Sequence, residues 1–397
     1  MHHILTQKVI PVVLFFAVVS MLLSFSVTAS AKSSTVLTQQ EVEKIVDNKI
    51  AAQQKEDSWI KKYNVKPILK TFVQYSLDLD TSAHQRRTTT QWDNAFDLTR
   101  FYFGFDADLT KHIMVEVKAD INAKAAAGAQ DSDFDIFLKT GFLEFGNFES
   151  APGLKFVVGQ ADLPWIGYVE GVWGYRMQGQ ILTDYERYLA STDVGVGVKY
   201  EFPEKWGDLH FSFVNGTGFN TGPENDNYKD FHLRATVKPL ANKNFFVSAL
   251  GVVGFTGSSS NDHERFAGLI GYKDKEHGTI AGEVLYAIDP AANLAARHPS
   301  LAALTGNAKG LGFSGFGELK FFWWEDPWDR FSIIGRVDFL DPDGSTDNNY
   351  HYHGISGLAY TLNDHFKFLI DHDWSSYQAG AGQRGNNTLF FQMEAKL

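Results

Sequence analysis

The stretch KHIMVEVKADIN, residues 111–122, decides the fold. Apolar or small residues occupy every second position from Ile113 to Ile121, and the positions beside them carry His112, Met114, Glu116, Lys118 and Asp120. Because successive side chains of a strand point to opposite faces, this pattern predicts a strand with one apolar and one polar face. Strands of soluble sheets usually run about five or six residues, whereas a strand that crosses a membrane needs about nine to eleven.

The same alternation returns about sixteen times between residues 67 and 397. We predict strands at 67–80, 93–107, 111–122, 133–147, 153–163, 192–203, 207–217, 227–240, 243–256, 261–274, 277–289, 309–324, 328–341, 350–363, 365–378 and 386–397. Short and long connections alternate between them, as they do in outer-membrane barrels. The sequence therefore predicts an all-β transmembrane fold, an antiparallel barrel of about 16 strands, and a barrel this wide leaves a water-filled channel.

The first residues read as an export signal. Lys8 supplies positive charge, residues 9–25 are almost wholly apolar, and Ala29-Ser30-Ala31 fits a cleavage site. We therefore expect residues 1–31 to be a cleaved signal peptide, with an uncleaved anchor helix as the alternative. Export and a barrel together predict the outer membrane of a Gram-negative bacterium as the location.

Residues 32–66 form a segment of another kind, which we expect to be periplasmic and helical. Thr38 and Glu41 make a capping box, and Val42, Ile45 and Val46 recur at helical spacing. Residues 38–62 form either a monomeric linker helix or a short trimeric coiled coil, and the sequence leaves both open. The barrel domain follows at residues 67–397.

Composition excludes several classes of protein. The net charge of −11 argues against nucleic acid as a partner, because phosphate binding needs a basic surface. The absence of cysteine excludes disulfides and thiol chemistry. A mean hydropathy of −0.21 is too low for a helical membrane protein but suits a barrel, whose lipid-facing residues occupy only alternate positions.

The longest connection, residues 164–191, is the candidate pore constriction. Its aromatic residues suit packing against an inner wall, and a ring of charge at a constriction filters ions by sign. The charged candidates in and beside this loop are Asp162, Glu170, Arg176, Asp184, Glu186 and Arg187. Charges at inward wall positions, of both signs, are Arg100, Glu116, Lys118, Arg234 and Arg336. The alternative is an external loop that only caps the barrel.

Several short motifs around this loop occur in a recognisable order. They are Gly141-Phe142-Leu143-Glu144-Phe145, Val158-Gly159-Gln160 with Pro164-Trp165, Tyr185-Glu186-Arg187, Val214-Asn215-Gly216-Thr217-Gly218, Tyr228-Lys229-Asp230 and Leu233-Arg234. Together they resemble the phosphate-selective porin O and P family over roughly residues 135–240. The resemblance implies a trimeric sixteen-stranded outer-membrane porin with an inward third loop, and anions such as phosphate as solutes. Asp162 stands where family members commonly carry Lys, so phosphate specificity is not carried over.

Three other groups of residues are weak candidates for metal binding or catalysis. His351 and His353 share a strand face near Asp371 and Asp373, which is a weak metal-site pattern. Residues 341–347 are rich in oxygen ligands but do not match a Ca²⁺-loop template, and such clusters mostly make turns. His210 and Ser212 share a face that is not the lipid face. We expect no metal, no cofactor and no enzymatic activity.

Two hypotheses of function remain. The first is passive diffusion of small hydrophilic solutes or ions through a porin, a homotrimer in contact with outer-membrane lipid. The second is a plugged or receptor-type structural barrel that binds a partner through its external loops. A separate plug domain would favour the second, and residues 32–66 are too short for one.

Overall fold

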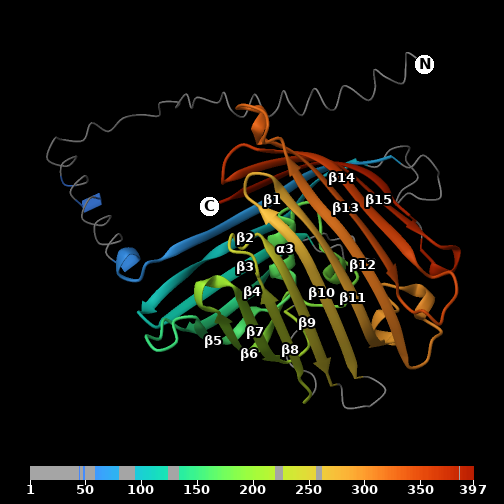
Figure 1. The fold of residues 1–397 in the computed structure, drawn as a ribbon, viewed down its shortest axis with the longest axis horizontal. Helices are drawn as coiled ribbons and strands as arrows, with labels where there is room; N and C mark the ends of the chain where they lie inside the picture. The colour runs from blue at the N-terminus through green and yellow to red at the C-terminus, as the bar shows by residue number, and fades with distance from the viewer. Residues whose placement is uncertain are drawn as a thin grey trace. The chain divides into compact units, whose positions relative to one another are not determined.

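Sixteen antiparallel strands close into a barrel in the described part of residues 60–397 (Figure 1). The computed structural model describes residues 44, 48–49, 59–79, 94–123, 134–219, 227–255, 262–383 and 385–397. The strands are β1 Lys66–Asp78, β2 Asn94–Thr110, β3 Ile113–Ala123, β4 Phe134–Phe145, β5 Leu154–Asp162, β6 Thr192–Glu201, β7 Gly207–Val214, β8 Asp230–Val237, β9 Phe245–Gly254, β10 His263–Asp274, β11 Gly278–Pro290, β12 Asn307–Lys320, β13 Phe331–Asp341, β14 His351–Thr361, β15 Phe366–Tyr377 and β16 Asn387–Lys396.

Each strand pairs with its neighbours in sequence, and β1 pairs with β16 to close the ring. Closure leaves no open sheet edge, which is what a strand structure needs in lipid. Each predicted strand matches an observed one. The largest difference in bounds is at β12, predicted at 309–324 and observed at Asn307–Lys320. The prediction of a closed 16-stranded barrel is confirmed.

The signal peptide and the helical segment predicted at the N-terminus lie mostly outside the described residues. The predicted signal peptide, residues 1–31, lies there entirely, as do residues 80–93, 124–133, 220–226 and 256–261 between the strands. Within the predicted helical segment, residues 44, 48–49 and 59–62 are helical. Among the described residues, no helix has both the length and the apolar character needed to cross a membrane.

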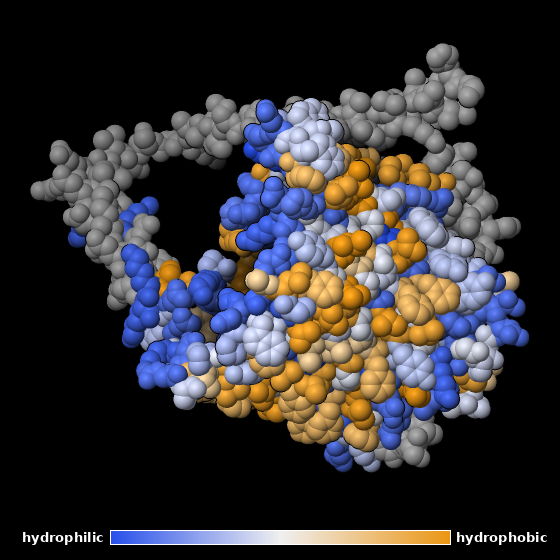
Figure 2. All heavy atoms as spheres, in the orientation of Figure 1, coloured by the Kyte–Doolittle hydropathy of each residue, from blue (hydrophilic) through white to orange (hydrophobic). Residues whose placement is uncertain are grey.

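The two faces of the wall differ as the alternation predicts. In β8, Phe231, Leu233 and Val237 are exposed outward, while His232 and Arg234 are buried on the lumen side. In Figure 2, apolar residues cover the middle of the visible wall and hydrophilic residues gather toward the ends of the strands. The outer surface therefore has the band that a lipid bilayer requires.

Exposed tryptophans lie at the short connections of the barrel. Trp206, Trp323, Trp324 and Trp328 are all exposed there. An amphipathic indole ring favours the headgroup zone, so these positions suit one edge of the bilayer. Trp374 lies on the outer face of β15 and covers Gly354, where an added Cβ would lie 2.3 Å from the indole.

Three register shifts interrupt the strand pairing on one side of the barrel; one lies at Asp108–Thr110 in the β2–β3 pair, and the other two are bulges within the wall. Phe72 faces Arg100 and Val73 faces Leu98, so Thr99 is an extra residue in β2. Lys118 faces Thr140 and Ala119 faces Leu138, so Lys139 is an extra residue in β4. A bulge breaks the strict alternation of faces, and here it directs additional side chains into the lumen.

Substitution of Val284 tests which face meets lipid. Val284 lies outward at the middle of β11. We expect Val284→Arg to destabilise the barrel by about 2–4 kcal/mol, because the guanidinium would lie near the bilayer midplane. Urea unfolding in phospholipid vesicles measures the change. Val284→Leu is the matched control, and Ile280→Arg, near the end of the same strand, should cost less. Equal effects at residues 280 and 284 would contradict this membrane position.

Candidate pore constriction

The connection between β5 and β6 folds into the barrel. It contains two short helices, α3 Ile166–Trp173 and α4 Leu182–Tyr185, which contact the lumen side of β11 and β12. Figure 1 shows α3 inside the ring of strands. The predicted inward third loop is confirmed, and the alternative of an external cap is wrong.

An apolar patch on the inner wall holds this loop. Ile166, Val169 and Trp173 of α3 are at most 1% exposed. They belong to one buried cluster with residues of β9 to β13 that face the lumen, namely Phe246, Leu250, Val252, Leu269, Phe316 and Ile334. Burying one large apolar side chain contributes about 1.5–3 kcal/mol, so the contact is strong enough to order the loop.

Hydrogen bonds from the wall fix the two ends of α3. At its start, Trp165 Nε1 donates to Glu283 over 2.7 Å and Arg234 donates to the carbonyl of Pro164 over 2.6 Å. At its end, Lys273 donates to the carbonyls of Gly171 and Val172 over 2.6 and 2.9 Å. Lys367 donates to the carbonyl of Gly174 over 3.0 Å. These ammonium groups satisfy free carbonyls at the negative end of the helix dipole.

A second anchor surrounds Glu186, which is 1% exposed. His351 Nε2 lies 2.8 Å from its carboxylate, Arg297 Nε 3.2 Å and His298 Nε2 3.7 Å. Burial raises the pKa of Glu186, but the hydrogen bond from His351 and the surrounding basic side chains hold it below its usual value. Burial lowers the pKa of His298 to about 4. Both effects favour an ionised Glu186 beside a neutral His298 at neutral pH.

Three of the predicted site residues are structural anchors. Glu186 is buried away from the passage, and Arg234 donates to Asp208 besides Pro164. Arg336, 2% exposed, donates to Asp338 and to the carbonyl of Gln180. Each satisfies a group of the loop or of the wall. Arg187 is exposed, with a φ of 63°.

The remaining candidates gather between the loop and the wall of β2, β3 and β5. Arg176 pairs with Glu170 and lies 3.8 Å from Asp184. Arg100 of β2 lies 3.7 Å from Asp120 of β3. The other candidates here are Lys118 and Glu116, whose charged groups lie 3.2 Å apart, and Asp162, which is exposed and acts electrostatically on Lys118. Charges of both signs therefore line this side. Burial raises the pKa of Glu170, against the pull of Arg176.

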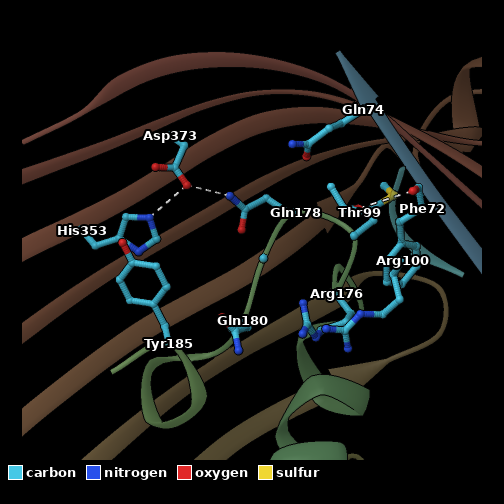
Figure 3. Close-up of a pocket in the computed structure, with 12 residues that line it drawn as sticks. Phe72, Gln74, Thr99, Arg100, Arg176, Gln178, Gln180, Tyr185, His353 and Asp373 are labelled. Atoms are coloured by element: carbon cyan, nitrogen blue, oxygen red, sulfur yellow. Dashed lines mark hydrogen bonds and ion pairs between the residues drawn. The ribbon is translucent and has the colours of Figure 1, made fainter. Parts of the chain in front are cut away.

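A cavity of about 320 Å³ lies between the loop and the wall. Its lining residues are Phe72, Gln74, Thr99, Arg100, Arg176, Met177, Gln178, Gly179, Gln180, Tyr185, His353 and Asp373. In Figure 3 the guanidinium groups of Arg100 and Arg176 lie side by side at one end. At the other end Asp373 accepts hydrogen bonds from His353 and Gln178 (Figure 3). Both guanidinium groups also face carboxylates outside the lining, Arg176 that of Glu170 and Arg100 that of Asp120.

Sequence reasoning missed Lys139, which the bulge in β4 directs inward. It is 5% exposed, it lies 3.6 Å from the centre of the Phe219 ring, and its ammonium donates to Ser191. Leu138 beside it is exposed outward. The adjacent pair Lys139-Thr140 is the only signal in the sequence, because two polar residues in succession break the alternation.

The weaker patterns have structural roles. His353 lies between Asp338 and Asp373, and His351 contacts Glu186. In the described residues no group of three or more His, Cys, Asp or Glu gathers as a metal site. Asp343 accepts hydrogen bonds from Ser345, Thr346 and the amide of Lys309, which makes a turn.

His210 and Ser212 lie on the lumen face of β7. Ser212 Oγ lies 3.4 Å from His210 Nε2, and both side chains are buried. Leu209 and Phe213 are exposed on the outer face instead. A reaction on membrane lipid would need the pair to face outward, so their position gives no support for such an enzyme.

Solved structures show what the chain is similar to. OprB of Pseudomonas putida matches with a TM-score of 0.60 at 9% identity, covering 86% of this chain and 96% of that one. The outer membrane channel DcaP of Acinetobacter baumannii gives 0.56 at 12%, covering 84% and 97%. The anion-selective porin from Comamonas acidovorans gives 0.56 at 8%, covering 84% and 99%. The chain has the fold of the outer-membrane porins. Neither a protein-family model nor a curated protein matches its sequence.

Acid should weaken the anchor around Glu186. The lowered pKa of Glu186 gives stability that is present above its unfolded pKa and lost as the pH falls through the lower folded value. The lowered pKa of His298 gives stability that is lost from about pH 6.5 down to about pH 4. We expect Glu186→Gln to cost about 1.5–3 kcal/mol at pH 7. It should also reduce the fall in unfolding temperature as the pH drops below 4.5, where Glu186 of the wild type takes up its proton, measured by circular dichroism in detergent.

Glu325→Gln, on an exposed short connection, is the control for this experiment. It removes the same charge without touching the anchor, so its pH dependence should equal that of the wild type. A Glu186→Gln variant that loses stability with acid as steeply as the wild type would contradict the role of this anchor.

Proposed function

We propose that the protein is a porin of a Gram-negative outer membrane that lets small hydrophilic solutes or ions diffuse passively. The main observation that supports this proposal is the cavity between the inward loop and the wall of β1 and β2, which is lined by Arg100 and Arg176. A closed barrel whose loop narrows the lumen without a plug domain in its described residues suits a size-limited channel. The fold shared with outer-membrane porins supports the same proposal.

The finer parts of the proposal rest on the sequence. Residues 1–31 would direct export and be removed, and the mature chain would assemble as a homotrimer, with residues 38–62 as a coiled coil or a linker helix. The resemblance to the phosphate-selective O and P family makes phosphate the first anion to test. The two guanidinium groups at one end of the cavity support an anion, because guanidinium binds phosphate and carboxylate in a bidentate manner.

A plugged barrel is the second candidate, and one observation favours it. The apolar packing of α3 against β9 to β13 fills that half of the lumen with side chains rather than water. Planar-bilayer recording separates the two candidates. Stepwise conductance of the purified protein is expected for a channel, and its absence would favour the plugged barrel.

Neutralising the guanidinium groups tests the constriction. We expect Arg100→Gln and Arg176→Gln each to shift the reversal potential in a KCl gradient toward cation preference. The permeability ratio should change about two- to fivefold, as expected when roughly 0.5–1 kcal/mol of charge interaction is removed. Glu170→Gln should shift the reversal potential the opposite way.

Lys111→Gln is the matched control, because Lys111 lies on an exposed short turn away from the cavity. Equal shifts in the control and in Arg176→Gln would refute the constriction. Added phosphate should reduce chloride conductance more in the wild type than in Arg176→Gln if the family resemblance extends to the solute.

A further inference from the structure

The cavity beside the constriction loop presents hydrogen-bond donors at one end. Arg100 of β2 and Arg176 of the loop place their guanidinium groups there, side by side (Figure 3). Arg100 Nε lies 3.7 Å from the carboxylate of Asp120. Arg176 meets the carboxylate of Glu170, also through Nε. A guanidinium carries five N–H donors, so most of the Nη hydrogens of both side chains stay available to an acceptor in the cavity.

This donor end carries little net charge. Asp120 and Glu170 do not line the cavity, but they are the ionic partners of the two arginines. Opposite charges this close cancel most of each other's field at the position of a solute further away. The arginines therefore offer hydrogen bonds to a carboxylate without the excess positive charge that would favour a dianion.

The opposite end of the cavity presents a carboxylate. Asp373 of β15 lines the cavity there, and its Oδ2 accepts hydrogen bonds from His353 over 2.9 Å and from Gln178 over 3.0 Å. Its Oδ1 accepts one bond of 3.3 Å from Asn386. An ionised carboxylate has about four lone-pair positions, so Asp373 keeps room for a further donor.

Gln178 adds an unpaired oxygen at the same end. Its side chain is 7% exposed, and its Nε2 is the atom that faces Asp373, because an ionised carboxylate can only accept. The Oε1 of Gln178 has no hydrogen-bond donor within the described part of the chain. Figure 3 shows this oxygen directed into the cavity. A buried carbonyl oxygen left without a donor is costly, so this atom requires a donor from water or from a solute.

We propose that the cavity binds zwitterionic solutes, amino acids or short peptides, on their way through the barrel. Arg100 and Arg176 bind the carboxylate of the solute, and Asp373 with the Oε1 of Gln178 binds its ammonium group. A carboxylate only accepts hydrogen bonds and an ammonium group only donates them, as the two ends require. This inference rests on the proposed channel function and names a class of solute for it.

The size and the two ends of the cavity together set the selectivity. A volume of about 320 Å³ is the share of about ten waters in the liquid, which is enough for a dipeptide. A simple anion leaves the acceptors at the Asp373 end unpaired, and a simple cation leaves the guanidinium donors unpaired. A site built to form hydrogen bonds discriminates against a ligand that lacks one of the partners.

Calorimetry on the full chain in detergent tests the site without requiring conductance. The probe is L-alanyl-L-alanine. It is compared with N-acetyl-alanyl-alanine, which has no ammonium group, and with alanyl-alaninamide, which has no carboxylate. We expect saturable binding of the dipeptide at one site per chain. Each capped peptide should bind about tenfold more weakly, because each cap removes one charged hydrogen-bonding group.

Variants at the two ends separate the two contacts. Arg176→Gln should weaken binding of the dipeptide and of the acetylated peptide about tenfold, without weakening that of the amide peptide. Gln178→Met, which keeps the length of the side chain, should weaken binding of the dipeptide and of the amide peptide about fivefold, without weakening that of the acetylated peptide. Lys111→Gln, on an exposed turn, is the control and should bind all three as the wild type does. Circular dichroism of each variant confirms that the barrel is folded.

Two results would overturn the proposal. One is no saturable binding of the dipeptide, and the other is an acetylated peptide that binds as tightly as the dipeptide. Swelling of liposomes that contain the protein, in an iso-osmotic solution of the dipeptide and separately of arabinose, tests the channel itself. Swelling without dipeptide binding overturns this inference and leaves the channel function standing. Dipeptide binding without swelling in either solute overturns the channel function and leaves the site standing.

Discussion

The constraint on which the structure depends is that no backbone amide or carbonyl group can be left unpaired in lipid. The pairing of β1 with β16 meets it, because it removes the two edges that an open sheet would leave. Sixteen strands then enclose a lumen too wide to be filled by wall side chains alone. The loop between β5 and β6 fills part of that space. Closure of the sheet therefore produces the wide lumen in which this loop can fold inward.

The loop is held by apolar packing and by charge together. The patch around Phe316 and Ile334 gives α3 an inner surface to cover, and Lys273 and Lys367 satisfy the carbonyls at its end. In a barrel without an inward loop, apolar residues on the inner face would be exposed to water in the lumen. Here they fix the loop against one half of the wall, and the charged residues of the other half remain available to solutes.

Much of the fold follows from the sequence, because a strand with lipid on one side and water on the other must alternate. The alternation of apolar and polar residues breaks where a strand does not have lipid on one side and water on the other. Ile333 and Ile334 are consecutive apolar residues because lipid covers one and α3 the other. Lys139 was missed because a bulge breaks the period locally. The role of Glu186 depends on His351, which is distant in the chain, and no local pattern reports such a pairing. The candidate wall charges were located by face, but their partners were not.

Because the loop is attached to one half of the barrel, different strands hold the loop and line the cavity beside Arg100. Strands β8 to β15 carry the contacts that keep the loop in place, and a change there endangers assembly. Strands β1 and β2 contribute Gln74, Thr99 and Arg100 to the lining of the cavity, and these side chains are not part of the apolar cluster that holds α3. Substitutions in these two strands can therefore reshape one side of the cavity while the contacts that hold the loop stay intact.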